Sequence, residues 1–147
     1  SPEQMSWKQS EERWTISEIL AHLVDVEEKV LGLRAKRIFL EDEPNLIPYD
    51  QMVAYLFGIY SNKDGFEMLE KFDKATQKSF EFLNQIQVSD LERIGQNPEV
   101  GEIKLVQILN LWAFHDLGHI RQIAEIIRAV NFWDGIGSLQ VYYKINP

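Results

Sequence analysis

Residues 112–123 read Trp112-Ala113-Phe114-His115-Asp116-Leu117-Gly118-His119-Ile120-Arg121-Gln122-Ile123. The chain contains three histidines, and two of them, His115 and His119, stand four residues apart in this stretch. On a helix that spacing places both imidazoles on one face, one turn apart, where they can share a metal ion. The same arc carries apolar residues, so both histidines are expected to point inward; these residues are Ile108, Leu111, Trp112, Ile123 and Ile126.

Three long helices are predicted around this stretch. The histidine pair lies in a helical pattern that runs from about Ile103 to Val130. A second helix is predicted from the capping box Thr15-Ile16-Ser17-Glu18 to about Leu40, and a third from about Phe66 to Ile86. The expected core residues of the third are Phe66, Phe72 and Phe80, and Trp112 is also expected in the core.

The third histidine, His22, belongs to the second helix. The apolar stripe of that helix comprises Ile16, Ile19, Leu23, Val26, Val30 and Leu33. His22 lies at the edge of this stripe, with Glu18, Asp25 and Lys29 on its polar side. We therefore expect His22 to face a pocket rather than the middle of the core.

The remaining segments are predicted to be short or irregular. Residues 1–14 favour a helical turn or two with Pro2 near its start, and Trp7 and Trp14 as anchors. Residues 41–51 and 90–101 read as loops, 51–60 as a short helix and 61–65 as a turn. The tail, 131–147, ends in an alternating run over 139–145 that predicts a short strand or an extended strap.

These elements predict one all-α domain spanning 1–147, with a short extended C-terminal tail. The helix lengths suit a four-helix bundle, although only three long helices are secure. Residues 1–14 or 51–60 could supply the fourth, or a helix could be missing before Ser1. A homodimer that covers the open face is a further hypothesis.

Composition excludes several functional classes. The net charge of −8 argues against binding nucleic acid, because a phosphate backbone requires a basic face. No apolar run approaches the roughly 20 residues that span a bilayer, and no signal peptide opens the chain, so no membrane partner is expected. The absence of cysteine excludes disulfides and protein thiolates, and it fits a reducing, cytoplasmic location.

Three inward histidines on two helices match a catalytic metal site with three protein ligands and one open position. Imidazole nitrogen suits zinc, nickel, copper or iron. Gln122, one turn beyond His119, and Glu18 and Asp25, which flank His22, are weaker candidates for orienting a ligand or moving a proton. Each of these residues also has a plain structural reading, as a helix-contact amide or a solvated charge, and the histidines could be metal-free core residues.

The segment His115-Asp116-Leu117-Gly118-His119 is also a degenerate form of the H-E-x-x-H metalloprotease motif. Aspartate is one methylene shorter than the glutamate that serves as general base there, and no third ligand of that class follows downstream. The metalloprotease reading is therefore disfavoured.

The chain resembles the DinB/YfiT-like superfamily from about Trp7 to Ala129. The resemblance rests on the order and separation of several short motifs: Trp14-Thr15-Ile16-Ser17-Glu18-Ile19-Leu20-Ala21-His22-Leu23, Ile47-Pro48-Tyr49-Asp50, Asn97-Pro98-Glu99-Val100-Gly101-Glu102 and His115-x-x-x-His119-x-x-Gln122-Ile123. Two features depart from the family pattern. Only 14 residues precede Thr15, where the family has a full first helix, and Asn97 stands where YfiT-like proteins tend to have histidine.

The resemblance implies a four-helix bundle in which His22, His115 and His119 hold a divalent ion, zinc or nickel. It also implies a metal-dependent hydrolase, or a transferase that uses a low-molecular-weight thiol, acting on a small-molecule substrate. A thiol would have to come from a bound cofactor, since the chain contains no cysteine. The alternative from another class is a non-catalytic metal-binding, ligand-binding or interaction bundle.

Overall fold

The computed structural model describes residues 1–50, 53 and 57–144. Its helical elements are α1 (Pro2–Ser6), α2 (Ile16–Val26), η1 (Glu27–Leu31), α3 (Gly32–Leu40), α5 (Gly65–Leu83), η2 (Val88–Glu92), α6 (Leu105–Phe132) and η3 (Asp134–Tyr142). Two short strands, β1 (Ile94–Asn97) and β2 (Gly101–Lys104), complete the set. The fold is thus mostly helical, but the expectation of a purely all-α protein is wrong because of this small sheet.

The helix predicted over 15–40 is confirmed as one continuous stretch, α2–η1–α3. Its capping box forms as expected: the Thr15 hydroxyl accepts from the Glu18 N–H at 3.0 Å, and the Glu18 carboxylate accepts from the Thr15 N–H at 2.8 Å. The stretch differs from an ideal helix at η1, which is a π-helical turn. A Cβ on Gly32 would lie 2.1 Å from the Glu27 carbonyl oxygen, so only glycine fits the widened turn without a shift.

The π turn explains why one member of the predicted apolar stripe is exposed. The other stripe residues are buried as expected, but Leu33 is 39% exposed; the buried ones are Ile16, Ile19, Leu23, Val26 and Val30. A π turn contains an extra residue, so it rotates every later position relative to an ideal helix. The buried apolar side chains are instead Leu31, at the end of the turn, and Ala35 and Ile38 after it.

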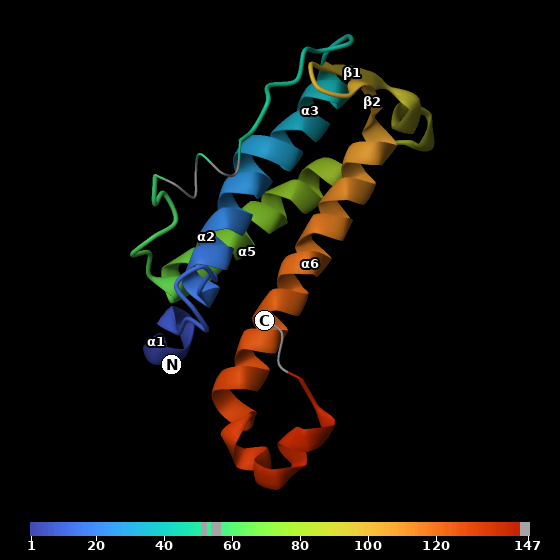
Figure 1. Cartoon of the computed structure of the whole chain (residues 1–147). Helices are drawn as coiled ribbons and strands as arrows, with labels where there is room; N and C mark the ends of the chain where they lie inside the picture. The colour runs from blue at the N-terminus through green and yellow to red at the C-terminus, as the bar shows by residue number, and fades with distance from the viewer. Residues whose placement is uncertain (51–52, 54–56, 145–147) are drawn as a thin grey trace.

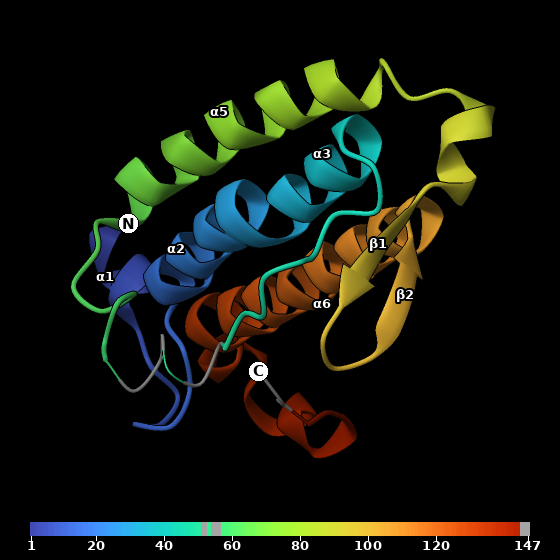
Figure 2. The same cartoon turned by 90° about the horizontal axis from the view of Figure 1, so that it is seen from above.

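The central helix α2–η1–α3 lies between α5 on one side and α6 on the other (Figures 1 and 2). Two apolar clusters hold these layers together. The first comprises Val26, Val30, Leu31, Ala35, Ile38, Leu46, Phe82, Leu105, Ile108 and Trp112. The second comprises Ile16, Ile19, Leu20, Ala21, Leu23, Tyr60, Met68 and Ile126, and Trp7 and Trp14 pack against it as the predicted anchors. The histidine-bearing parts of α2 and α6 therefore face each other across a packed interface.

The predicted face of α5 is wrong in part. Phe66 is 49% and Phe80 is 61% exposed, whereas Phe72 is partly buried. The buried positions of α5 are instead Gly65, Met68, Ala75, Ser79 and Phe82. Gly65 lets α5 approach α2 closely, since a Cβ there would lie 2.6 Å from the Ser17 hydroxyl oxygen. Phe80 lines a groove between α5 and α6, and Phe66 lines a separate pocket beside α1 and α6.

The loop expected over 90–101 folds into η2 and most of a β-hairpin. β1 and β2 pair antiparallel, with Ile94 opposite Lys104 and Asn97 opposite Gly101. The turn closes because the Asn97 side-chain oxygen accepts from the N–H groups of Glu99 and Val100, at 2.9 and 3.2 Å, and Gly101 adopts φ +80°. Four residues per strand are too few for a reliable alternating pattern, which is why the hairpin was missed.

The C-terminal tail is also different from the prediction. Residues 134–142 form the 3₁₀ helix η3, bent at Gly137 (φ +52°), rather than a strand or a strap. Residue 145, the last of the predicted alternating run, lies outside the described residues. The Gln140 side chain donates to the Trp133 carbonyl at 2.8 Å and closes the turn.

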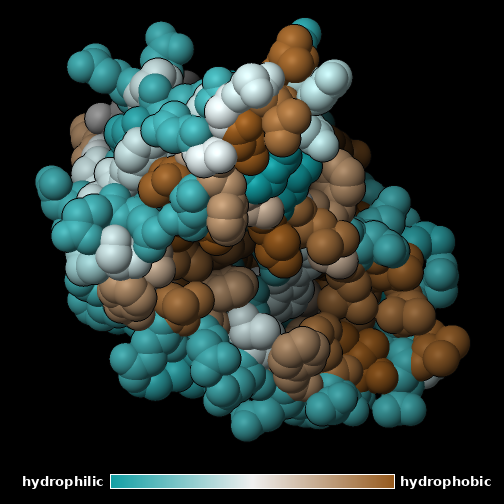
Figure 3. Space-filling model, turned by 90° about the horizontal axis from the view of Figure 1, so that it is seen from below, coloured by the Kyte–Doolittle hydropathy of each residue, from teal (hydrophilic) through white to brown (hydrophobic). Residues whose placement is uncertain are grey.

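Figure 3 shows the end of the molecule seen from below, where apolar side chains lie inside a largely polar margin.

Among the described residues, the three long helical stretches 16–40, 65–83 and 105–132 are those predicted, to within a few residues. Of the two segments considered for a fourth helix, 1–14 supplies only α1, a single short helix capped by Ser1. Of the other, predicted as a short helix over 51–60, residues 57–60 form turns, and 51, 52 and 54–56 lie outside the described residues.

Candidate metal centre

His22, His115 and His119 come together between α2 and α6. The Nε2 atom of His115 lies 3.1 Å from that of His22 and 3.2 Å from that of His119. His22 is only 1% exposed and His119 only 9%, while His115 is partly buried. Residues 93 positions apart in the chain therefore present one nitrogen each to a common point.

The opposite nitrogen of each ring has its own partner. His115 Nδ1 lies 3.0 Å from the Asp116 carboxylate, His119 Nδ1 lies 2.7 Å from the Gln122 side-chain oxygen, and His22 Nδ1 lies 3.4 Å from the Tyr60 hydroxyl. A carboxylate and an amide oxygen only accept, so the Nδ1 atoms of His115 and His119 carry the hydrogen. Their Nε2 lone pairs are then left facing one another, with no hydrogen between them.

The chemistry of this arrangement fits a cation. Zinc–nitrogen bonds of about 2.0–2.1 Å in tetrahedral geometry separate the ligand nitrogens by about 3.3 Å, close to the two distances observed. Converging lone pairs repel one another unless a positive charge lies among them. Three imidazoles suit zinc, nickel, copper or iron, and they leave a fourth position for another ligand.

The electrostatics favour the neutral form that a metal requires. Burial lowers the pKa of His22 to about 3, and the neighbouring His119 and His115 act in the same direction. Burial also lowers the pKa of His119, although the hydrogen bond with Gln122 opposes the change. Neutral imidazole is the metal-binding form, so His22 and His119 have no proton to lose to a metal near neutral pH.

The Trp14 ring packs against two of the three histidines, His22 and His119. The Trp14 ring contacts His22 edge-on, with centroids 5.0 Å apart, and lies parallel to His119 at 6.2 Å. Beside His119 a cavity of about 190 Å³ opens, lined by Gln9, Glu12, Arg13, Trp14, Ile19, His119, Gln122 and Ile126. The cavity therefore lies directly beside one of the three histidines.

The weaker sequence candidates separate into three different roles. Gln122 contacts His119 directly, as proposed for a residue that orients a ligand. Asp25 reaches His22 only through Tyr60. Glu18 caps the start of α2 and pairs with Lys8 at 3.4 Å, so its carboxylate is used in holding the helix end.

Asp116 is the residue of the degenerate H-E-x-x-H motif, and its carboxylate lies behind His115, on Nδ1. That position is opposite to the converging Nε2 atoms, which is where the general base of a metalloprotease would be needed. Asn97, which departs from the family pattern, uses its side chain to close the hairpin turn.

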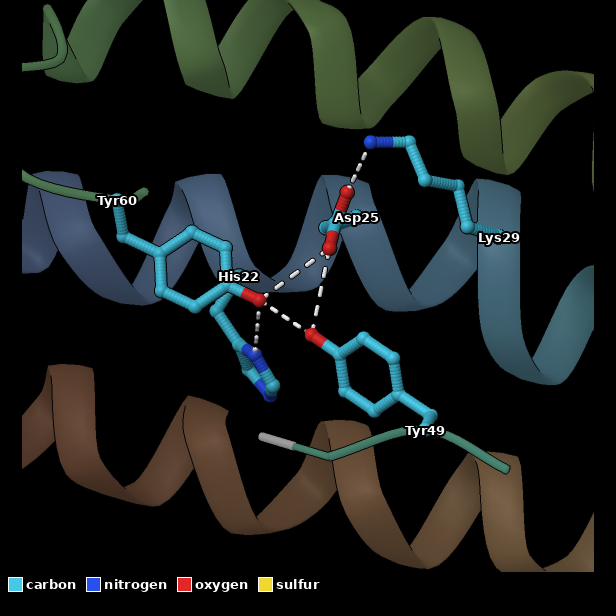
Figure 4. A network of polar contacts seen from close by, with 5 residues as sticks. All are labelled: His22, Asp25, Lys29, Tyr49 and Tyr60. Carbon is cyan, nitrogen blue, oxygen red and sulfur yellow. Dashed lines mark hydrogen bonds and ion pairs between the residues drawn. The ribbon is translucent and has the colours of Figure 1, made fainter. Parts of the chain in front are cut away.

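Sequence reasoning missed Tyr60 and assigned no role to Tyr49. Tyr60 lies 38 residues from His22, in a turn that carries no motif, so the sequence contained no signal for its contact with the ring. Tyr49 lies in the segment Ile47-Pro48-Tyr49-Asp50, which contributed only to the family resemblance. Nothing in the local pattern predicted that these two side chains meet (Figure 4).

No helix in the described part of the chain is both long enough and apolar enough to cross a bilayer.

Two bacterial relatives share sequence with this chain. A Bacillus cereus (strain B4264) protein named "Putative metal-dependent hydrolase" is 27% identical over 120 residues, which cover 81% of this chain and 68% of that protein. A protein of the same description from Oceanobacillus iheyensis is 24% identical over 116 residues, covering 78% and 66%.

The fold also matches a solved structure, described as YfiT from Bacillus subtilis, "a probable metal-dependent hydrolase with an unusual four-helix bundle topology". The TM-score is 0.76 at 22% identity, and the match covers 88% of this chain and 74% of that one. At this identity the likeness concerns the fold alone. The family model described as the DinB superfamily matches residues 1–123, the greater part of the chain. This chain belongs to the DinB superfamily.

Proposed function

We propose that this protein is a metal-dependent hydrolase that binds one divalent ion, zinc or nickel, through His22, His115 and His119. The observation that carries the proposal is the convergence of the three Nε2 atoms while every Nδ1 has a partner. The names of the sequence relatives support the same chemistry.

When bound, a divalent ion in such a site lowers the pKa of water toward neutrality and polarises a carbonyl or phosphoryl oxygen. The protein's own residues would do the remaining work. Asp116 and Gln122 hold the Nδ1 hydrogens of His115 and His119 and so keep both rings in the ligating tautomer. Trp14 shields the ring faces from water on the α2 side.

The cavity beside His119 is the proposed place for a small substrate. Gln122 uses its side-chain oxygen on His119, so its NH₂ group remains to donate to a carbonyl or carboxylate oxygen of a molecule in that cavity. Ile19 and Ile126 form an apolar wall against which the rest of a small substrate can pack.

The test begins with metal content, measured by elemental analysis on protein purified without a histidine tag. We expect about one zinc or nickel per chain in the wild type and a large loss in His119→Ala. Hydrolysis of a panel of small esters, amides and phosphoesters, with and without chelator, then tests the activity. Failure to bind metal after reconstitution with excess zinc or nickel would refute the site and the hydrolase together.

A thiol-conjugation assay on the same preparations separates the second chemistry. Conjugation of a low-molecular-weight thiol to an electrophile, in place of hydrolysis, would identify a transferase. Metal binding without either reaction would instead identify a non-catalytic metal-binding bundle.

A further inference from the structure

Behind His22 a chain of polar contacts runs from the metal centre to the protein surface (Figure 4). His22 Nδ1 lies 3.4 Å from the Tyr60 hydroxyl, and the Tyr60 and Tyr49 hydroxyls contact each other. Both hydroxyls lie 3.3 Å from one oxygen of Asp25, whose other oxygen pairs with Lys29. The network joins α2 to two segments outside the long helices, those that carry Tyr49 and Tyr60.

The number of available hydrogens determines which tautomer of His22 the network favours. The Asp25 carboxylate, paired with Lys29, only accepts, and each tyrosine can donate one hydrogen. If Tyr60 donated to His22, only the Tyr49 hydrogen would remain for the contacts among Tyr49, Tyr60 and Asp25. If His22 Nδ1–H donates to Tyr60 instead, both hydroxyl hydrogens stay available for Tyr49 and Asp25. Within the network of Tyr60, Tyr49 and Asp25, that arrangement makes the most hydrogen bonds. It also leaves the Nε2 lone pair of His22 free, as a metal ligand requires.

Tyr49 also connects His22 to a covering segment. Residues 44–50 run along α3 as an extended strap (Figure 2), fastened where Arg37 donates to the Asn45 carbonyl and Arg34 to the Ile47 carbonyl, both at 2.7 Å. Leu46 is buried in the core, and its N–H donates to the Gln96 carbonyl at 2.7 Å. The Tyr49 side chain packs on the same core cluster, so the far end of the strap is attached through the Tyr49–Tyr60–Asp25 contacts.

We propose that Tyr60 and Tyr49 are positioning residues: through one hydrogen-bond chain they hold His22 in its metal-binding tautomer and couple metal binding to the docking of the 44–50 strap. The inference rests on the three-histidine centre proposed above. A hydrogen-bond partner on the non-ligating nitrogen fixes the ring and raises its basicity as a ligand. Coupling is reciprocal, so a metal that orders His22 stabilises the docked strap, and a docked strap tightens metal binding.

The first experiment measures the zinc dissociation constant, by competition with a chromophoric chelator, for wild type and three variants. We expect Tyr60→Phe to weaken zinc binding by about 10- to 100-fold, because it leaves the His22 Nδ1–H without an acceptor. Tyr49→Phe and Asp25→Asn keep that acceptor and should weaken binding less, by roughly 2- to 10-fold. Tyr142→Phe, at a residue 76% exposed in η3, serves as the matched control and should change nothing.

Two further readouts separate positioning from a general structural role. Cobalt-substituted Tyr60→Phe should show an altered visible d–d spectrum, whereas the spectrum of Tyr142→Phe should match the wild type. In hydrogen exchange, zinc should protect the amides of Asn45, Leu46, Ile47 and Tyr49 in the wild type, and this protection should be reduced in Tyr49→Phe. If the Tyr60 variant is unfolded, Tyr49→Phe and Asp25→Asn carry the test.

The proposal would be overturned if Tyr60→Phe bound zinc within twofold of the wild-type affinity. It would also be overturned if zinc protected the strap amides equally in Tyr49→Phe and the wild type. A wild type that binds no zinc would refute the metal centre itself. Because the readouts are affinity, spectrum and exchange, absence of hydrolysis would leave the positioning role intact and refute only the catalytic part of the proposed function.

Discussion

His22 and Glu27 are two buried polar residues of the same central helix, and their surroundings differ in kind. Glu27 is 5% exposed and faces the groove of about 340 Å³ between α5 and α6, where its carboxylate accepts from the Trp112 indole N–H at 2.7 Å. Burial raises the pKa of Glu27, and hydrogen bonds from Ser79 and Trp112 oppose that rise. Glu27 is an acceptor matched with donors.

The histidines present the opposite case: the Nε2 lone pairs of His115 and His119 face each other, and His22 Nε2 lies 3.1 Å from His115 Nε2. The burial of a polar side chain is therefore not by itself evidence for a bound metal ion. A buried acceptor that meets donors completes the protein's own hydrogen bonding, whereas buried acceptors that converge on one another require something positive from outside.

The largest expected effect separates the two clusters by metal content. His115→Ala removes one of three ligands and should weaken zinc binding by at least about 100-fold, because each ligand contributes directly to holding the ion. Glu27→Gln should leave zinc binding within a fewfold of wild type. Elemental analysis and chelator competition on both variants measure the zinc content and the zinc affinity. An equal loss of zinc binding in the two variants would contradict the distinction between the histidine cluster and the Glu27 cluster.

The pH dependence of stability should also have opposite signs at the two residues. The pKa of His22 falls to about 3 on folding, from an ordinary value of 6.5, so between these pH values the unfolded chain binds more protons. The metal-free protein should therefore lose stability as pH falls from 6.5 toward 3, by on the order of 4 kcal/mol from this residue. The raised pKa of Glu27 acts in reverse: its contribution is fully present at low pH and falls as pH rises past the ordinary value of 4.5.

Urea unfolding of metal-free protein from pH 4 to 7 measures these slopes. Relative to wild type, His22→Gln should flatten the rise of unfolding free energy with pH, and Glu27→Gln should steepen it. Identical profiles for both variants and the wild type would show that neither residue titrates as the folded environment requires.

A smaller effect is expected at the donor of the Glu27 hydrogen bond. Trp112→Phe keeps most of the ring but removes the indole N–H, which leaves the buried carboxylate with one donor fewer. We expect a loss of about 1.5–3 kcal/mol in the free energy of unfolding, with zinc binding retained. Loss of zinc together with stability would mean that the Glu27 cluster supports the metal centre after all.

The smallest effects contrast two glycines of the long helices. At Gly32 a Cβ would clash with the Glu27 carbonyl and approach the Trp112 ring at 3.1 Å, so Gly32→Ala should cost about 1–3 kcal/mol. Gly118 lies in α6 between His115 and His119, and a Cβ there meets nothing within 4 Å. Gly118→Ala should therefore stabilise the fold by about 0.5–1 kcal/mol through helix propensity, without changing zinc binding. Thermal and urea unfolding of the two variants test this opposition of sign.

Local signals predicted the parts of this molecule that depend on near neighbours. The Thr15–Glu18 box, the continuous helix over 16–40 and the helix around His115 and His119 were all found from spacing, because capping and helical periodicity involve residues three or four apart. The three histidines were chosen on the same grounds, and their convergence follows from two amphipathic helices packing face to face.

The predictions failed where the result depends on distant parts of the chain. The exposure of Phe66 and Phe80 depends on how α5 packs against α2. The hairpin depends on which short segments of the chain pair with each other. The exposure of Leu33 depends on the one added residue of the π turn, and no periodic pattern in the sequence indicates that turn.

The long helices, the cap of α2 and the choice of the three histidines all followed from patterns among residues three or four positions apart. Asp116 and Gln122 lie one and three residues from the histidines whose outer nitrogens they hold. Tyr60 on His22, and Tyr49 as the link from the strap to Tyr60, are contacts that only the folded chain shows. The physical reason is range: helical hydrogen bonds close within four residues of the chain, whereas the bonds that orient His22 join residues 24 to 38 positions apart, which only the folded path brings together.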